Sequence, residues 1–331
     1  MEGKIDLSKR NAFPSRPLHL QIPTTPPIII VPYGFFMGLG FAGIVLISLS
    51  CGASSRRGQQ ELASALRLTL ALAVIFARLF SILMEDGLLS LLKRPIRTLF
   101  RPGFWLHGGL SGAAAGALIS YRLGQVEEFA KFAGSLAISL PLYEGFSRIG
   151  CHTYGCCYGR VVDKSTKKST LWYLVPFPAV IYDHPTHYAV TRIQPALLNK
   201  ELIPIQLISS ALFFSLFFFI ALPLSLYCRL EIAGSATLAL HGVIRMLTEK
   251  DRMDYRGEQK LRLSTTGRIT AVQIIFAGGL IARIMQKHSF HSADYTPYLP
   301  IRREHLGEFT FPIILGIIVY GVHVGEVGSW I

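Results

Sequence analysis

The sequence predicts an all-α fold, a bundle of transmembrane helices, and three observations lead to this prediction. Hydrophobic residues make up 51% of the 331 residues and charged residues only 16%, whereas a soluble domain carries roughly a quarter charged residues. The mean hydropathy is +0.42, and long apolar runs without charge recur along the chain. This composition excludes a disordered chain, which needs low hydrophobicity.

The net charge of +13 does not indicate nucleic-acid binding. A nucleic-acid-binding module needs a basic face on a soluble fold, and this chain is too apolar to supply one. We therefore expect no nucleic acid as a partner, and we expect the basic excess to serve membrane orientation or contact with an anionic lipid.

Eight apolar runs, each bounded by polar or charged residues, are the predicted elements. About 20 apolar residues are enough to cross a hydrocarbon core of roughly 30 Å. In chain order the runs are 28–50, 62–84, 104–121, 129–147, 202–228, 232–247, 269–284 and 309–325. Seven of them form the expected bundle, and the eighth is an additional candidate span.

We expect three parts in the chain. Residues 1–27 are a polar, Pro-rich N-terminal segment, residues 28–285 a membrane domain, and residues 286–331 a C-terminal extension that holds the extra run. The first apolar run follows a long polar stretch, so it does not have the form of a signal peptide. Five cysteines are too few and too unevenly spaced for a disulfide framework.

Ionisable residues inside spans are costly, and by default they face protein or a water-filled cavity. The first such cluster surrounds His107, which precedes Gly108 and Gly109 in the third run. Gly108, Gly112 and Gly116 lie four residues apart, a spacing typical of a close-packing helix face. His107 is then either a hydrogen-bonded interfacial histidine, or a general base or a ligand to a polar head group.

The second cluster begins at Arg148, which we expect to end the fourth span. Glycines after it, including Gly150, would shape a loop at membrane depth, which is tolerated only where protein or a cavity satisfies the backbone. A guanidinium suits phosphate because it stays charged and binds in a fork. The alternative is a snorkelling arginine paired with Glu144 one turn earlier.

The same segment gathers three cysteines, Cys151, Cys156 and Cys157, with His152 among them. A zinc site and a redox pair are the alternatives that these residue types suggest. The spacing is not a usual zinc pattern, so we expect no metal. A cysteine near arginines is also a candidate nucleophile, because neighbouring cations lower a thiol pKa.

The third cluster is a polar stripe near the end of the sixth run. His241, Arg245, Glu249 and Arg252 have helical spacing and would share one face. The stripe is either an internal ion-pair ladder, in which Arg245 pairs with Glu249, or an anion site in which Glu249 orients an arginine.

Smaller signals are Tyr33 followed by Gly34 at the entry of the first span, Arg78 in the second, and Gln206 at the entry of the fifth. Each of these alone is more typical of a structural role than of a functional one.

Taken in order, the clusters resemble the prolipoprotein diacylglyceryl transferase family, a seven-span membrane fold. The matching motifs are Tyr33-Gly34, His107-Gly108-Gly109, Arg148-Ile-Gly150, Pro204-Ile-Gln206-Leu207 and Gly242-Val-Ile-Arg245 with Glu249. The likeness runs from about Pro32 to Leu280. Five motifs in order at compatible spacing are a much stronger signal than any one of them.

The sequence departs from the family's pattern after Arg148. Cys151 and Tyr154 stand where the family typically has asparagines, and Cys156 stands at its glutamate position. The Gly-Gln element of the seventh span reads Gly267-Arg268 here. These departures resemble a divergent branch in which the arginines are retained and the acceptor side of the site has changed.

The resemblance implies an integral membrane enzyme that moves a diacylglyceryl group from an anionic phospholipid such as phosphatidylglycerol to an acceptor nucleophile, with glycerol phosphate leaving. Such chemistry needs a deprotonated nucleophile and stabilisation of the departing phosphate. We expect Arg148 and Arg245 at the phosphodiester and His107 as a base or head-group contact.

The remaining expectations concern the surroundings of the reaction. The residues expected to line or orient the lipid site are Tyr33, Arg78, Gly108, Gly109, Gly150, Gln206, Glu249 and Arg252. We expect no cofactor, a membrane phospholipid as donor, an unidentified protein or small molecule as acceptor, and a monomer. The alternatives are a lipid-binding or lipid-transport protein without chemistry, and a metal or redox protein built on the cysteine loop.

Overall fold

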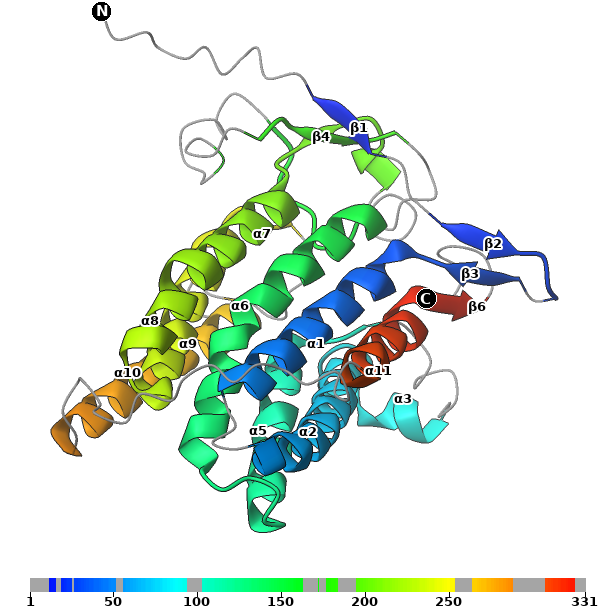
Figure 1. Cartoon of the computed structure of the whole chain (residues 1–331). Coiled ribbons are helices and arrows are strands. Elements are labelled where there is room, and N and C mark those ends of the chain that lie inside the picture. Colours follow the sequence, from blue (N-terminus) through cyan, green and yellow to red (C-terminus); the bar gives the residue numbers. More distant parts are fainter. Residues whose placement is uncertain are drawn as a thin grey trace, which may run out of the picture.

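The structure is a computed structural model. It describes residues 12–15, 19–25, 27–51, 56–93, 103–162, 172, 177–183, 195–253, 264–287 and 307–324. It confirms the predicted fold class, because the described chain is a bundle of long helices with two small sheets at one end (Figure 1).

Each predicted run contains a helix. The bounds are α1 Pro32–Cys51, α2 Arg56–Ser81, α3 Leu88–Lys93, α5 Leu106–Arg122, α6 Phe129–Tyr154, α7 Ile205–Leu216, α8 Leu222–Tyr227, α9 Leu230–Glu249, α10 Thr265–Lys287 and α11 Gly307–Gly316. Single π-helical turns extend three of them, namely η2 Ile82–Asp86 after α2, η7 Phe217–Ala221 between α7 and α8, and η9 Ile317–Gly321 after α11.

By length and apolar composition, five of the described helices are able to cross a membrane. They are Pro32–Cys51, Gly58–Met84, Ile205–Tyr227, Leu230–Glu249 and Thr265–Ile284. Helix α5 has only 17 residues, and α6 carries Lys131, Glu144 and Arg148 within its 26 residues. The number of spans therefore stays a prediction.

The first predicted run begins differently from our expectation. Residues Ile28–Ile30 form strand β3, and α1 starts at Pro32. A proline disfavours helical geometry in the residue before it and is well suited to the first helical position. The eighth run likewise ends in a strand, β6 Val322–Val324, which pairs antiparallel with β3.

The two small sheets lie beside the end of the bundle where α1 begins and α6 ends (Figure 1). One has the order β2 Leu20–Ile22, β3, β6, with all pairs antiparallel. The other has the order β1 Phe13–Ser15, β4 Val180–Tyr182, β5 Glu201–Leu202, in which the β1–β4 pair is parallel.

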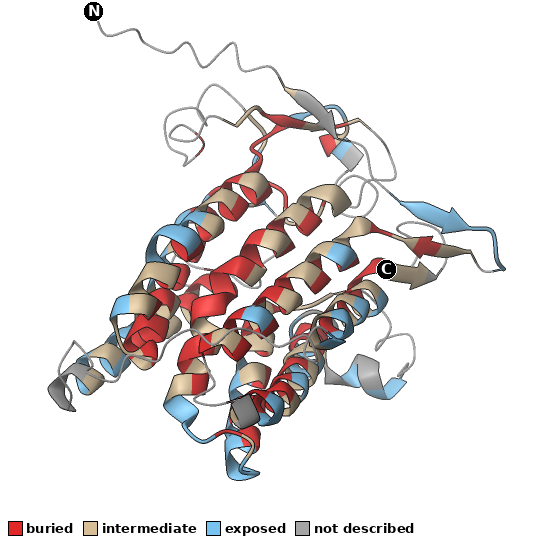
Figure 2. Ribbon diagram, in the orientation of Figure 1, coloured by how far each residue is buried: buried red, intermediate tan, exposed pale blue. Residues whose placement is uncertain are grey.

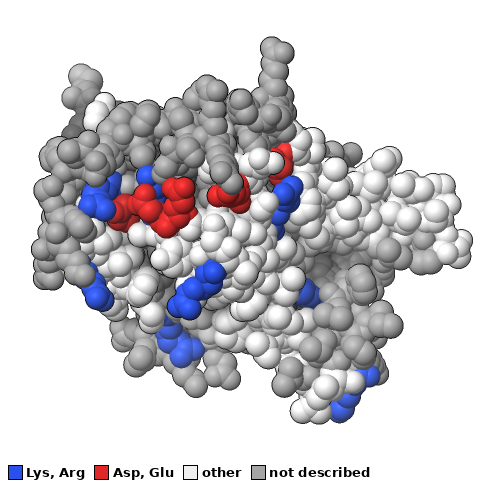
Figure 3. Space-filling view, turned by 60° about the horizontal axis from the view of Figure 1, so that its bottom comes forward, with Lys and Arg blue, Asp and Glu red and all other residues white. Residues whose placement is uncertain are grey.

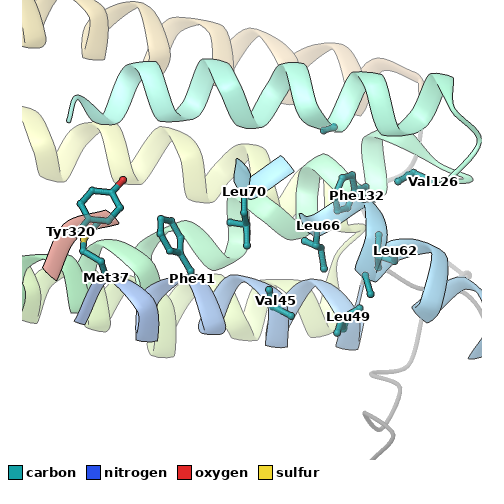
Figure 4. Packing of buried hydrophobic residues seen from close by; sticks show 13 residues of the cluster. Met37, Phe41, Val45, Leu49, Leu62, Leu66, Leu70, Val126, Phe132 and Tyr320 are labelled. Atoms are coloured by element: carbon teal, nitrogen blue, oxygen red, sulfur yellow. The ribbon is translucent and has the colours of Figure 1, made fainter. Parts of the chain in front are cut away.

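Helix α6 is the central element, packed against α1, α7 and α9, and its buried residues run along most of its length (Figure 2). An apolar core joins α1 to α2: Met37, Phe41, Val45 and Leu49 follow one face of α1 opposite residues of α2 (Figure 4).

Glycine faces bring the helices close together. A Cβ at Gly112 of α5 would lie 2.3 Å from the Leu72 carbonyl oxygen of α2, so only glycine allows this approach. The predicted packing face of Gly108, Gly112 and Gly116 is therefore present, and its neighbour is α2. Close backbone approach through small residues is a general means of helix association in membranes.

Parts of the described outer surface carry large apolar side chains and few charges (Figure 3). In Figure 3 charged side chains occupy a few groups and most of the described surface carries neither sign. Large apolar side chains stand exposed on η7 and α10, among them Phe218, Phe219, Ile275 and Phe276. Exposed apolar residues on long helices fit contact with lipid chains.

Candidate active site inside the helix bundle

The centre of the site is the carboxylate of Glu144, which is 2% exposed on α6. Arg148, one turn later on the same helix, donates to its Oε2 from Nη2 at 2.7 Å and from Nε at 3.2 Å. Arg245 on α9 donates to the same oxygen from Nη1 at 3.3 Å. One carboxylate therefore holds two guanidinium groups, and the three side chains together carry one excess positive charge.

The two arginines are buried, each 6% exposed. The Nε of Arg245 is a buried donor without a hydrogen-bond partner among the described residues. Buried donors are normally paired, and an excess cationic charge in a low-dielectric interior attracts anions strongly. The cluster is thus arranged to receive an anionic group.

The structure corrects the expected partner of Glu249. Arg245 points toward α6 and pairs with Glu144, whereas Glu249, the last residue of α9, accepts a hydrogen bond from Ser264 Oγ at 2.5 Å. The i,i+4 spacing permitted an Arg245–Glu249 pair, but the helix face that holds Arg245 is turned toward the neighbouring helix.

Arg252 is also placed differently from our expectation. Helix α9 ends at Glu249, so Arg252 does not continue the helical stripe. It lies in a bridge with Gly159, next to the hydrogen bond from Arg160 N to Asp251 O at 3.0 Å. The segment after α6 and the segment after α9 are therefore held side by side.

His107 on α5 faces α10. Its Nε2 lies 3.2 Å from Thr270 Oγ1, and that hydroxyl donates its proton to the Thr266 carbonyl at 2.8 Å. With the single Thr270 hydroxyl proton assigned to the Thr266 carbonyl, His107 Nε2–H is the donor of the first bond. The lone pair of the ring then lies on Nδ1, as a general base requires.

His241 on α9 is also buried inside the bundle, where it contacts both an aromatic ring and an amide side chain. Its ring stacks on Phe213 with centroids 5.0 Å apart. Gln273 Nε2 lies 3.1 Å from His241 Nδ1 and also donates to Leu238 O at 3.0 Å. With this assigned amide orientation, His241 carries its proton on Nε2, which is buried without a partner among the described residues.

The segment after Arg148 is helical, which corrects the expected loop. Helix α6 continues to Tyr154, and Gly155 closes it in the left-handed conformation with φ +80°, a common helix ending. Gly150 serves packing instead: a Cβ there would lie 2.7 Å from Tyr33 Cδ2. The Tyr33 ring in turn stacks on Tyr154 at 5.8 Å.

The three cysteines come together around this helix end. Cys151 Sγ lies 3.7 Å from Cys157 Sγ, and the three sulfur atoms all lie within 4.8 Å of one another. Gln206 donates to the Cys156 carbonyl at 2.9 Å and to the Tyr182 hydroxyl at 3.0 Å. Gln206 thus supports the cysteine segment.

Hydrogen bonds from the thiols of Cys151 and Cys156 hold the pKa of the Cys157 thiol well below its usual value. The charges of Arg252 and Arg148 act in the same direction. Cys157 is therefore the thiol that most readily becomes a thiolate.

Two expected site residues, Arg78 and Gly108, serve the packing of α2 and α5, and a third, Gly109, would tolerate a Cβ. Arg78 donates to Gly103 O at 2.8 Å and lies 6.0 Å from the Phe104 ring centroid, so it ties α2 to the segment before α5. A Cβ at Gly108 would lie 2.5 Å from Phe76 O, whereas one at Gly109 would find its nearest neighbour at 3.7 Å.

Sequence reasoning named Glu144 only as a partner of a snorkelling arginine and missed it as the centre of the site. An acidic residue inside an apolar run was the signal that pointed to it. It missed Thr270, Ser264 and Tyr182 altogether, because a hydroxyl in a helix or strand has no distinctive spacing.

A bundle of long apolar helices that encloses paired arginines and histidines defines a multi-pass membrane protein with a polar site in its interior. The chain belongs to the prolipoprotein diacylglyceryl transferase family, a family of integral membrane transferases, whose model matches residues 20–284. This match confirms the resemblance drawn from the motifs, and it ends before α11.

The sequence is also similar to two bacterial proteins that are named as transferases of this family. The phosphatidylglycerol–prolipoprotein diacylglyceryl transferase 2 of Clostridium perfringens is 28% identical over 259 residues, which cover 77% of this chain and 91% of the relative. The phosphatidylglycerol–prolipoprotein diacylglyceryl transferase of Clostridium tetani is 32% identical over 177 residues, which cover 52% of this chain and 61% of the relative.

Proposed function

We propose that this chain transfers a diacylglyceryl group from phosphatidylglycerol to an acceptor thiol. The names of its relatives supply the donor, and the observation that carries the proposal is the Glu144 carboxylate shared by Arg148 and Arg245. This cluster keeps an excess positive charge inside the bundle, and that charge attracts anions. The anionic group of a phospholipid is its phosphodiester, so we assign the cluster to that group.

The reaction is a substitution at a glycerol carbon. The acceptor sulfur forms a bond to that carbon, the carbon–oxygen bond to phosphate breaks, and glycerol phosphate leaves with the bonding electron pair. The leaving oxygen gains negative charge, and preorganised cationic donors stabilise such charge most where water is excluded. Arg148 and Arg245 are assigned to the phosphate for this reason.

Glu144 has a positioning role. It fixes both guanidinium groups through one oxygen, and it does not neutralise them because two cations face one anion. The Nε of Arg245 remains available to a phosphate oxygen.

The nucleophile must lose a proton. A free thiol has a pKa of about 8.5, so a base accelerates the reaction at neutral pH. His107 Nδ1 is the assigned acceptor of that proton, since Thr270 holds the other ring nitrogen. Tyr33, Gly150 and Gln206 are assigned to the walls of the site.

The test is a transfer assay with the purified full chain in phosphatidylglycerol vesicles and a peptide that contains one cysteine. A thioether-linked diacylglyceryl peptide and released glycerol phosphate, both measured by mass spectrometry, are expected. Arg148→Lys and Arg245→Lys should each lower kcat by about 10²–10³, while Arg67→Lys, at an exposed pair with Glu308, should have little effect.

Two outcomes would decide against the proposal. Bound phosphatidylglycerol without any release of glycerol phosphate would indicate a lipid-binding protein on the same scaffold. Full activity of both lysine variants would remove the assignment of the two arginines.

A further inference from the structure

Three thiols meet at the end of α6, where the helix closes at Gly155. Cys151 comes from the last turn of the helix, and Cys156 and Cys157 follow the cap. The chain turns back so sharply that Cys157 takes φ +58°, one of two positive φ values at non-glycine residues in the described part of the chain. A strained backbone of this kind persists only where its surroundings impose it, and such residues gather at functional sites.

The surroundings hold the turn from two sides. Gln206, which is 1% exposed, donates hydrogen bonds from Nε2 to the Cys156 carbonyl and to the hydroxyl of the buried Tyr182. On the other side, Met253 N donates to Tyr158 O at 3.1 Å. The positions of the sulfur atoms are therefore preorganised by residues from α7, β4 and the segment after α9.

We propose that Cys151, Cys156 and Cys157 form a three-thiolate site for a thiophilic divalent cation, for which Zn²⁺ is the natural probe. Tetrahedral zinc binds sulfur at about 2.3 Å, which places the sulfur atoms about 3.8 Å apart. The Cys151 and Cys157 sulfurs are already 3.7 Å apart and all three lie within 4.8 Å. The spacing in sequence argued against zinc, but the fold brings one pair of sulfurs to the separation that zinc requires and holds the third sulfur within 4.8 Å of both.

Two arginines belong to the segments around the cluster. Three thiolates around one divalent cation carry a net charge of −1, Arg148 lies one turn before Cys151 on α6, and Arg252 forms a bridge with Gly159, two residues after Cys157. Metal ligands must be deprotonated, so neighbouring arginines assist binding here.

Two other uses of the cluster fit less well. A disulfide requires sulfurs about 2.05 Å apart and would join two of the cysteines while leaving the third unused. A lipid carried on one of these thiols would be held by a thioether, and a second transfer would then have to expel a thiolate from carbon.

Among the described residues the cluster offers three ligands, and zinc sites with three protein ligands keep a fourth position for water or substrate. If the proposed function holds, on which this step rests, the acceptor thiol fits there. A metal held by the three cysteines would favour loss of the acceptor's thiol proton, and the sulfur would then form its bond to the glycerol carbon as the carbon–oxygen bond to glycerol phosphate breaks. The thiol proton passes to His107 or to water.

The experiment uses the full chain, purified in detergent under reducing conditions, stripped with chelator and then dialysed against Zn²⁺. Elemental analysis should give about one Zn²⁺ for each chain, and Co²⁺ in its place should give intense sulfur-to-cobalt charge-transfer absorption. Cys151→Ser and Cys157→Ser should each lose most of the metal and the absorption. Cys228→Ser, outside the cluster, should keep both.

Folding is checked by the melting temperature. Added Zn²⁺ should raise Tm in the wild type and in Cys228→Ser, but not in the cluster variants. Folded wild-type protein that takes up neither Zn²⁺ nor Co²⁺ overturns the proposal, as does uptake that persists in the cluster variants or a Cys151–Cys157 disulfide in protein from native membranes.

The step with the acceptor is tested separately. A cysteine peptide should shift the Co²⁺ absorption, and its serine analogue should not. If metal is absent while thioether product still forms, the metal site fails and the proposed function stands; if metal binds and no product forms, the function fails and the site stands.

Discussion

Arg245 on α9 donates to the same Glu144 oxygen that Arg148 holds, across 101 residues of sequence. The contact fixes α9 against α6 and sets the distance between the two guanidinium groups. Breaking a buried ion pair by removing one partner leaves an uncompensated charge, which costs about 3–5 kcal/mol.

Glu144→Gln should therefore lower both stability and transfer. The two arginines then face each other without a carboxylate, so Tm should fall and kcat should fall with it. Thermal melting in detergent and the vesicle assay measure the two effects. The control is Glu128→Gln, because Glu128 is 62% exposed in its pair with Lys131 and such pairs contribute at most about 1 kcal/mol. Unchanged Tm in Glu144→Gln would contradict the central role of this carboxylate.

His107→Gln should slow transfer by about 10²–10⁴, the usual contribution of a general base. The deficit should shrink as the pH rises through about 8.5, because the acceptor thiol then ionises by itself. Rates from pH 6 to 9.5 check this, with Thr270→Ser as a control that retains the hydroxyl. A deficit of constant size across that range would assign His107 to binding.

Gly112→Ala should destabilise the α2–α5 pair, because the new methyl group would lie 2.3 Å from the Leu72 carbonyl oxygen. Overpacking of this kind typically costs about 1–3 kcal/mol. Gly109→Ala is the matched control on the same helix, since its nearest neighbour would be 3.7 Å away. Equal melting temperatures for the two variants would show that α5 is free to move away from α2.

Cys157 should be the fastest of the loop cysteines to react with iodoacetamide in metal-free protein. Hydrogen bonds from Cys151 and Cys156 lower the pKa of Cys157, whereas burial raises the pKa of Cys228. The rate at Cys157 should therefore decline less than the rate at Cys228 as the pH falls from 8.5 to 7. Peptide mass spectrometry after timed quenching follows each residue, and parallel decline at both would be inconsistent with a stabilised thiolate.

Local patterns in the sequence predicted much of the fold. The apolar runs gave the helices, and the one-turn spacing of Glu144 and Arg148 gave the first ion pair as an alternative. The prediction that the helix ends near Gly150 was wrong. A glycine that makes room for the Tyr33 ring cannot be distinguished in the sequence from a glycine that begins a loop.

Contacts between distant helices were beyond the reach of such patterns. The spacing of Arg245 and Glu249 indicated a pair, but which side of α9 meets α6 depends on packing along the whole bundle. The gathering of three cysteines similarly depends on where α6 stops and on Gln206 from another helix.

The pairing of β3 with β6 has a consequence for the two ends of the chain. Val31 N donates to Gly321 O at 2.8 Å, and Tyr320 lies edge-on to Tyr33 with centroids 6.0 Å apart. The segment that follows the family-matched region thus supplies part of the wall behind a candidate site residue. A truncation that removes Tyr320 and Gly321 would therefore also remove contacts at the start of the first helix, including the ring contact with Tyr33.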